Sequence, residues 1–130
     1  MSEFLRIVIA IILILHGVGH ILAIFPIVGK KLSPTHSSNS WLLTKLIGNT
    51  GTYVVAFIIW PLALIGFVAG GFGLLGWFVP QAWWPSLTVG AAIISLLGLG
   101  LFWNAFPFFF PNKVGVIVVD VLALLSFLWT

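Results

Sequence analysis

Residues 53–79 form an apolar run that contains no charged side chain. A transmembrane helix needs about 20 consecutive, predominantly apolar residues, whereas a β-strand usually ends after about 4–8 residues. The run also lacks the alternation of polar and apolar residues that is typical of a transmembrane β-strand. Because a helix pairs its own backbone N–H and C=O groups, it is the element that lipid favours. The sequence therefore predicts a membrane-spanning helix here.

The composition of the whole chain indicates that its solvent is lipid. Hydrophobic residues make up 62% of the 130 residues and charged residues only 5%, against about a quarter in an ordinary soluble domain. A soluble domain with this composition would lack the polar side chains that its surface needs. We therefore predict an integral membrane protein, with the lipid bilayer as its main partner and lipid as a bound component.

The residue counts also exclude several kinds of site. The chain contains no cysteine, which excludes disulfides, thiolate metal sites and iron–sulfur clusters. Lys and Arg number five against two Asp and Glu, but these basic residues form no stripe of the kind that binds nucleic acid. They flank the apolar runs, where they would meet lipid head groups. We therefore expect no nucleic-acid partner.

Four apolar segments are long enough, or nearly so, to span a bilayer. They cover residues 4–28, 53–79, 87–106 and 114–130. The sequence predicts an all-α fold, a single domain over residues 1–130 that forms an integral membrane bundle of four antiparallel transmembrane helices. The first segment is too long for a typical signal-peptide core and has no clear cleavage site, so we expect it to be retained. Pro107 is expected to limit the third segment.

The longest connection in this scheme is an interfacial loop over residues 29–52. Ser40 is suited to cap a short helix from Trp41 to Ile47, which would lie at the membrane interface. Four of the five basic side chains belong to this loop or to the 108–113 loop: Lys30, Lys31, Lys45 and Lys113. The positive-inside rule then places both loops in the cytoplasm and both termini outside, in a multi-pass protein of the cell membrane.

Two histidines and one acid are the ionisable groups most suited to chemistry. His16 and His20 are four residues apart, so they share one face of a helix. Asp120 is the only acidic residue deep within a predicted span, and ionisable groups in membranes usually face the bundle interior. Counting residues from the helix ends places Asp120 and His20 at a similar depth. Asn104 lies near the same end of the third segment and joins the predicted cluster.

This cluster is open to several interpretations. An imidazole that donates to Asp120 or to a carbonyl would be a structural hydrogen bond between helices. His16, His20 and Asp120 also resemble the two-histidine, one-carboxylate ligand set of iron or zinc sites. Haem ligation by one histidine is a third interpretation. A proton relay or quinone site is a fourth, in which His and Asp bind the quinone carbonyl and aromatic side chains hold its ring.

Small residues and proline mark the second segment. Gly66 and Gly70, with further glycines after them, form a surface on which helix backbones can approach closely. We interpret this surface as a contact inside the monomer, with contact to another subunit as the alternative. Pro61 should kink the helix. The large aromatic residues of the later segments are expected to face lipid rather than a cofactor: Trp60, Trp77, Trp103 and Phe108–Phe110.

Three stretches of the chain carry a resemblance to known proteins: LHGVGH at residues 15–20, GNTGTYVVAFIIWPLALIGFVAGGFGLL at residues 48–75, and Trp83–Trp84. With them, the chain resembles a group of small bacterial four-helix membrane proteins and, more loosely, the DoxX-like membrane proteins. The resemblance implies a four-helix membrane fold. DoxX-like proteins are sometimes linked to quinone-dependent redox complexes, which implies quinone as a candidate ligand. The resemblance assigns no catalytic residue.

Three functional hypotheses follow from the sequence. The leading one is a non-enzymatic accessory or scaffold subunit of a larger membrane complex, in contact with other subunits or with copies of itself. The second is a redox or ligand-binding membrane protein that uses His16, His20 and Asp120, with Asn104, to hold a quinone, haem or metal. The third is a small transporter or lipid-binding protein, which requires a polar cavity from the lysine-rich loops to Asp120. No motif of a known enzyme class is found.

Overall fold

The computed structural model describes residues 1–126 and 128, and all regular elements among them are helical. The long helices are α1 (Glu3–Gly19), α3 (Leu43–Leu75), α4 (Trp84–Leu101) and α5 (Val114–Ser126). Shorter elements extend or connect them: α2 (Ile21–Ile24), η1 (Phe25–Val28), η2 (Gln81–Trp83), η3 (Trp103–Ala105) and η4 (Phe109–Lys113). The all-α prediction is confirmed, while residues 127, 129 and 130 of the last predicted span lie outside the described residues.

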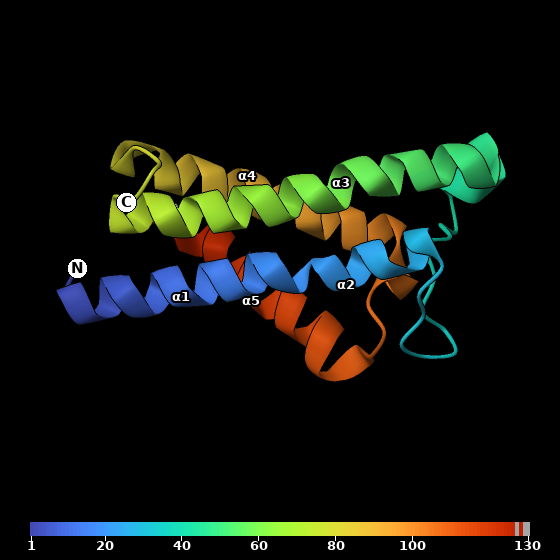
Figure 1. Ribbon diagram of the computed structural model, residues 1–130, viewed down its shortest axis with the longest axis horizontal. Coiled ribbons are helices and arrows are strands. Elements are labelled where there is room, and N and C mark those ends of the chain that lie inside the picture. Colours follow the sequence, from blue (N-terminus) through green and yellow to red (C-terminus); the bar gives the residue numbers. More distant parts are fainter. Residues whose placement is uncertain (127, 129–130) are drawn as a thin grey trace.

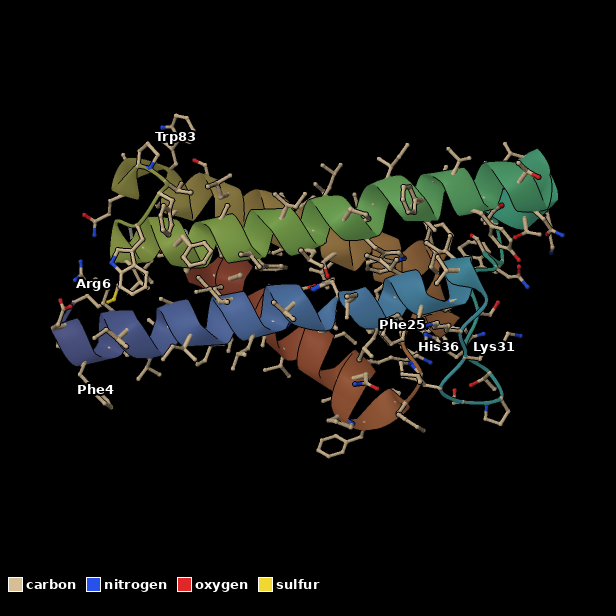
Figure 2. The ribbon with its side chains drawn as sticks, viewed as in Figure 1. Phe4, Arg6, Phe25, Lys31, His36 and Trp83 are labelled. Carbon is tan, nitrogen blue, oxygen red and sulfur yellow. The ribbon has the colours of Figure 1, made fainter. Side chains whose placement is uncertain are left out.

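Successive long helices run in opposite directions along the bundle (Figure 1). The helix α3 packs most extensively against α4 and α1, and α5 packs mainly against α4. In contrast, α1 and α5 approach each other much less closely. Arg6 and Trp83 lie at one end of the bundle, and Lys31 and His36 lie at the other (Figure 2). This arrangement agrees with the predicted bundle of four antiparallel helices.

The surface of this bundle is apolar. Four helical stretches are long and hydrophobic enough to cross a membrane: Glu3–Val28, Leu43–Leu75, Gln81–Leu101 and Phe109–Ser126. Only 22–33% of each span is buried inside the bundle, and side chains such as Leu97 in α4 are 63% exposed. Water disfavours such a surface, whereas lipid does not. The fold is therefore that of a small multi-pass integral membrane protein.

The start of α3 differs from the predicted one. We expected a separate interfacial helix at residues 41–47 and a span from residue 53, but α3 begins at Leu43 and continues to Leu75. Ser40 caps its start as predicted, since the Oγ of Ser40 accepts from the N–H of Leu43 at 3.1 Å. The backbone is not helical at Gly48 (φ 76°, ψ −179°), so a first helical piece ends at Ile47, the predicted end of the short helix, and meets the span at a kink. Glycine adopts this left-handed φ at little cost.

The ends of two spans were predicted too late. The helix α3 ends at Leu75 rather than at residue 79, because Gly76 adopts a φ of 73° and the N–H of Trp77 bonds the carbonyl of Phe72 at 2.9 Å. This is the Schellman arrangement that terminates many helices. The helix α4 ends at Leu101, well before Pro107, because Phe102 leaves the helical conformation with a ψ of 63°.

Close contacts explain the glycines of α3. A Cβ atom on Gly66 would lie 2.8 Å from the Cβ of Ala91 in α4, and one on Gly71 would lie 2.9 Å from the carbonyl oxygen of Ala10 in α1. The glycine surface is thus a contact inside the monomer, as interpreted. The prediction that Trp60 faces lipid is wrong, because this residue is fully buried against Phe102 and Phe106.

His36 fixes the interfacial loop to the bundle. Its Nε2 lies 2.8 Å from the carbonyl oxygen of Leu22 and 2.7 Å from that of Ala105, and its Nδ1 accepts from the N–H of Leu32 at 3.1 Å. Because carbonyls only accept, Nε2 must carry the proton. Both ring nitrogens are engaged, so His36 is a structural residue that joins the loop to the ends of two spans.

Replacing His36 with Ala should destabilise the fold by about 2 kcal/mol, since it leaves buried backbone groups without partners. The free energy of unfolding can be measured by titration with a denaturing detergent in mixed micelles. The matched control is Thr35→Ala, at an exposed neighbouring position, which should change the free energy by less than about 0.5 kcal/mol. Equal effects of the two substitutions would contradict the structural role.

Candidate functional site

The predicted histidine–acid cluster exists in the interior of the bundle. The Nε2 of His16 in α1 lies 2.7 Å from the Oδ1 of Asp120 in α5. Asp120 and His20 are fully buried, and the side chain of His16 retains 9% exposure. This hydrogen bond joins α1 and α5, two elements that otherwise touch little.

His20 is held in one orientation by its own helix. Its Nδ1 lies 2.9 Å from the carbonyl oxygen of His16, a partner that the backbone N–H of His20 would take in a regular α-helix. That N–H bonds the carbonyl of Gly17 instead, at 3.0 Å. The Nδ1–H of the ring therefore takes the acceptor that a backbone N–H would use. This exchange of donors accounts for the break between α1 and α2.

The hydrogen bonds of His20 also define its tautomer. Since a carbonyl can only accept, Nδ1 of His20 carries the proton and the neutral ring leaves a lone pair on Nε2. The Oγ of Ser95 in α4 lies 2.8 Å from this Nε2 and donates to it. Ser95 is fully buried. Three helices thus supply one polar cluster: His16, His20, Ser95 and Asp120.

One oxygen of this cluster has no partner. The Oδ2 atom of Asp120 is buried and makes no hydrogen bond within the described part of the chain. A buried polar atom without a partner costs about 1–3 kcal/mol, and more when it is charged. An ordered water or an ion would satisfy such an atom.

Aromatic rings enclose the two histidines. The ring of Phe67 lies 4.6 Å from that of His16, edge to face, and 5.5 Å from that of His20, nearly stacked. Trp60 and Phe106 lie 6.0 and 5.8 Å from His20 between ring centroids. These rings shield His20 from lipid on the sides that its hydrogen bonds leave free.

A groove lies on the outer side of His16, between α1 and the start of α5. Its volume is about 360 Å³, and it is open along one side. The walls are mostly apolar and include Phe106, and the two polar side chains on them are His16 and Asn112. Gly19 and Gly115 also line the groove, and a Cβ atom on either would meet nothing within 4 Å. The absence of side chains at these two positions therefore leaves the groove open.

The groove and the buried cluster meet at His16. Asp120 is not among the residues that line the groove, and neither is any lysine. The transporter hypothesis requires a polar cavity that is continuous from the lysine-rich loops to Asp120. This groove is not such a cavity. The Oδ1 atom of Asn112 and the Nε1 atom of Trp60 are likewise buried without a partner among the described residues.

The sequence predicted part of this site. His16, His20 and Asp120 lie together, whereas the side chain of Asn104 is exposed in η3 and makes no hydrogen bond to them. Ser95 and Asn112 were missed. Ser95 is one of several small polar residues in apolar segments, and only the packing of α4 shows which one contacts a histidine.

No protein-family model, curated protein or solved structure matches this chain.

Proposed function

We propose that this integral membrane protein binds a lipid-soluble molecule with a hydroxyl-bearing aromatic head, of which a quinol is the example, in the groove between α1 and α5. The observation that supports it best is the position of His16. One of its ring nitrogens bonds the buried Asp120 at 2.7 Å, and the residue also lines a groove in the lipid-facing surface. A molecule that enters from the bilayer would meet His16 as the polar end of an apolar path.

The size and walls of the groove suit such a head group. Ligand sites in proteins typically have volumes of about 300–1,000 Å³, with apolar walls and a few polar groups; this groove has about 360 Å³ and two polar side chains. Phe106 offers an aromatic wall for a ring. The open side of the groove leaves room for an isoprenoid or acyl tail to extend into the lipid.

The second ring nitrogen of His16 favours a ligand that donates hydrogen bonds. When the Nε2–H of His16 donates to the Asp120 carboxylate, Nδ1 of the neutral ring is an acceptor. The Oδ1 of Asn112 is buried without a partner in the described chain, so it is not presented to the groove. An acceptor at the polar end of an apolar groove fits a hydroxyl group better than a carbonyl, which supports the reduced, quinol form of a quinone.

The test fills the groove without disturbing the cluster. In Gly115→Leu, the new side chain occupies space that is empty in the structure, so the fold should persist and the ligand should be excluded. The matched control is Gly90→Leu in α4, where a Cβ also meets nothing within 4 Å and which does not line the groove. The probe is a short-chain ubiquinol, titrated into the protein in lipid nanodiscs and quantified by native mass spectrometry.

We expect the unmodified protein and Gly90→Leu to bind the ubiquinol equally, and Gly115→Leu to bind it at least about tenfold more weakly, which corresponds to about 1.4 kcal/mol. The matching ubiquinone should bind more weakly than the ubiquinol. Equal binding by the two leucine variants would show that the molecule partitions into lipid or binds elsewhere, and the proposal would then be rejected.

The hypothesis of an accessory subunit stays a prediction. The glycine surface that motivated it is used inside the monomer, so contact with other subunits depends on the remaining exposed apolar surface, which lipid also covers. Mild extraction from native membranes tests this hypothesis separately. A protein that migrates only as a monomer under these conditions would contradict it.

A further inference from the structure

We infer that His16, His20 and Asp120 form a binding site for one divalent transition-metal ion. This inference goes beyond the ligand groove and concerns the opposite, buried side of His16. The three residues each offer one ligand atom, and these atoms all lie within 4.8 Å of one another. They come from the end of α1, from the residue that follows it and from α5.

An ion can enter once the side chains readjust, since their ligand atoms lie up to 4.8 Å apart. Zinc lies about 2.0–2.2 Å from nitrogen and carboxylate ligands, so two ligands of one ion are about 3.3 Å apart in a tetrahedral site. The Nε2 of His16 and the Oδ1 of Asp120 are 2.7 Å apart and would separate by about half an ångström. His16 would then hold its proton on Nδ1, because the ion takes the lone pair of Nε2.

The hydrogen bonds of His20 match those of a metal ligand. Histidines that bind metals almost always donate their other N–H to a carbonyl, a carboxylate or water, which fixes the ring and its tautomer. The Nδ1 of His20 donates in this way to the carbonyl of His16 at 2.9 Å. Its Nε2 presents a lone pair to the interior, where the Oγ of Ser95 lies 2.8 Å away.

The unpartnered oxygen of Asp120 gives an independent argument. Asp120 is fully buried in α5, and its Oδ2 atom has no hydrogen-bond partner in the described chain. A purely structural histidine–aspartate bond leaves this oxygen unsatisfied. A cation among the three residues would interact with both carboxylate oxygens and would remove this deficit.

The donor atoms define the class of ion. Two imidazole nitrogens and a carboxylate, without any thiolate, suit zinc, iron, cobalt, nickel or copper rather than the all-oxygen sites of calcium and magnesium. Three protein ligands leave a fourth position, beside Ser95, for water. We therefore expect a four-coordinate site of the zinc type.

The experiment uses cobalt(II) as a spectroscopic probe of the purified, full-length protein in nanodiscs after treatment with a chelator. A four-coordinate cobalt site gives intense visible absorption, whereas hydrated cobalt gives almost none. We expect saturable absorption at one cobalt per chain, and its loss when zinc is added. This measurement depends on no substitution, so a variant that folds poorly cannot obscure it.

Variants then assign the ligands. In Asp120→Asn the side chain keeps its size and an acceptor for His16 but loses the charge. We expect this variant to bind cobalt more than about 100-fold more weakly. Loss of a residue that only supports a ligand costs about 10–100-fold in metal affinity. The matched control is His36→Gln, which removes a histidine whose two nitrogens are already engaged and should bind cobalt normally.

Gly115→Leu separates this inference from the proposed function, because it blocks the groove and should leave cobalt binding unchanged. The inference would be overturned if the unmodified protein showed no saturable cobalt absorption, or if Asp120→Asn bound cobalt as tightly as the unmodified protein. In either case the cluster would be a hydrogen-bonded contact between helices.

Discussion

Replacing His16 with Leu should destabilise the protein by about 3 kcal/mol, the largest effect that we expect from a single substitution. The imidazole of His16 donates to the Oδ1 of Asp120, and the Oδ2 of this acid has no partner within the described chain. Its removal leaves a fully buried acid with two unpartnered oxygens inside a lipid-embedded bundle. Breaking a buried pair costs about 3–5 kcal/mol, and an acid at the centre of a membrane helix costs about 2.5–3.5 kcal/mol.

The double variant His16→Leu/Asp120→Leu separates two free energies. One is the cost of burying Asp120 without a partner, and the other is the contribution of the His16–Asp120 hydrogen bond to stability. Polar contacts between membrane helices contribute only about 0.6–2 kcal/mol, and buried pairs are often replaced by apolar residues at little cost. We therefore expect the double variant to regain most of the stability lost in His16→Leu. Unfolding titrations in mixed micelles measure all three proteins. A double variant as unstable as the single one would show that His16 acts through packing alone.

Transfer of the protein from detergent into plain buffer should cause nearly complete aggregation, the second large effect. Between 67% and 78% of each candidate span, the complement of the buried 22–33%, is not buried inside the bundle. Burial of apolar surface contributes about 25 cal/mol per Å², so association of these exposed faces outweighs any loss of freedom on aggregation. Light scattering and size-exclusion chromatography after removal of detergent measure the outcome.

The control for this transfer is the same protein in lipid nanodiscs, which should stay monodisperse because lipid covers the apolar faces. Exposed apolar patches of this extent are rare on soluble monomers. A protein that remained dispersed in buffer without detergent or lipid would contradict the membrane assignment and, with it, the interpretation of the groove as open to the bilayer.

His16 joins the two proposals, because the residue lines the groove and its Nε2 bonds Asp120 in the buried cluster. An ion on Nε2 would require the proton on Nδ1, which converts this second ring nitrogen from acceptor to donor. The metal-loaded protein should then favour a carbonyl head group over a hydroxyl one. The two sites are therefore distinct but chemically coupled through a single ring.

The sequence alone determined the solvent, the fold class and the number of spans, because these depend on the length and polarity of each segment rather than on its neighbours. A run such as residues 53–79 has to be helical wherever it sits in a bilayer, since lipid offers its backbone no partners. The i, i+4 relation of His16 and His20 is equally local. Element ends were less predictable. The helix α3 ends before Gly76 and kinks at Gly48, because both glycines adopt backbone angles that the residue type permits but does not impose.

Only the tertiary structure decided which distant residues meet. Nothing in the polarity of α4 distinguishes Ser95 from other small polar residues, and nothing local removes Asn104 from the cluster or buries Trp60. Those outcomes depend on the rotation and depth at which each helix packs, which are set by close approaches such as Gly71 on Ala10 and Gly66 on Ala91. The spacing of residues along one helix predicts which of them share a face. The site, however, depends on how three helices are placed relative to one another.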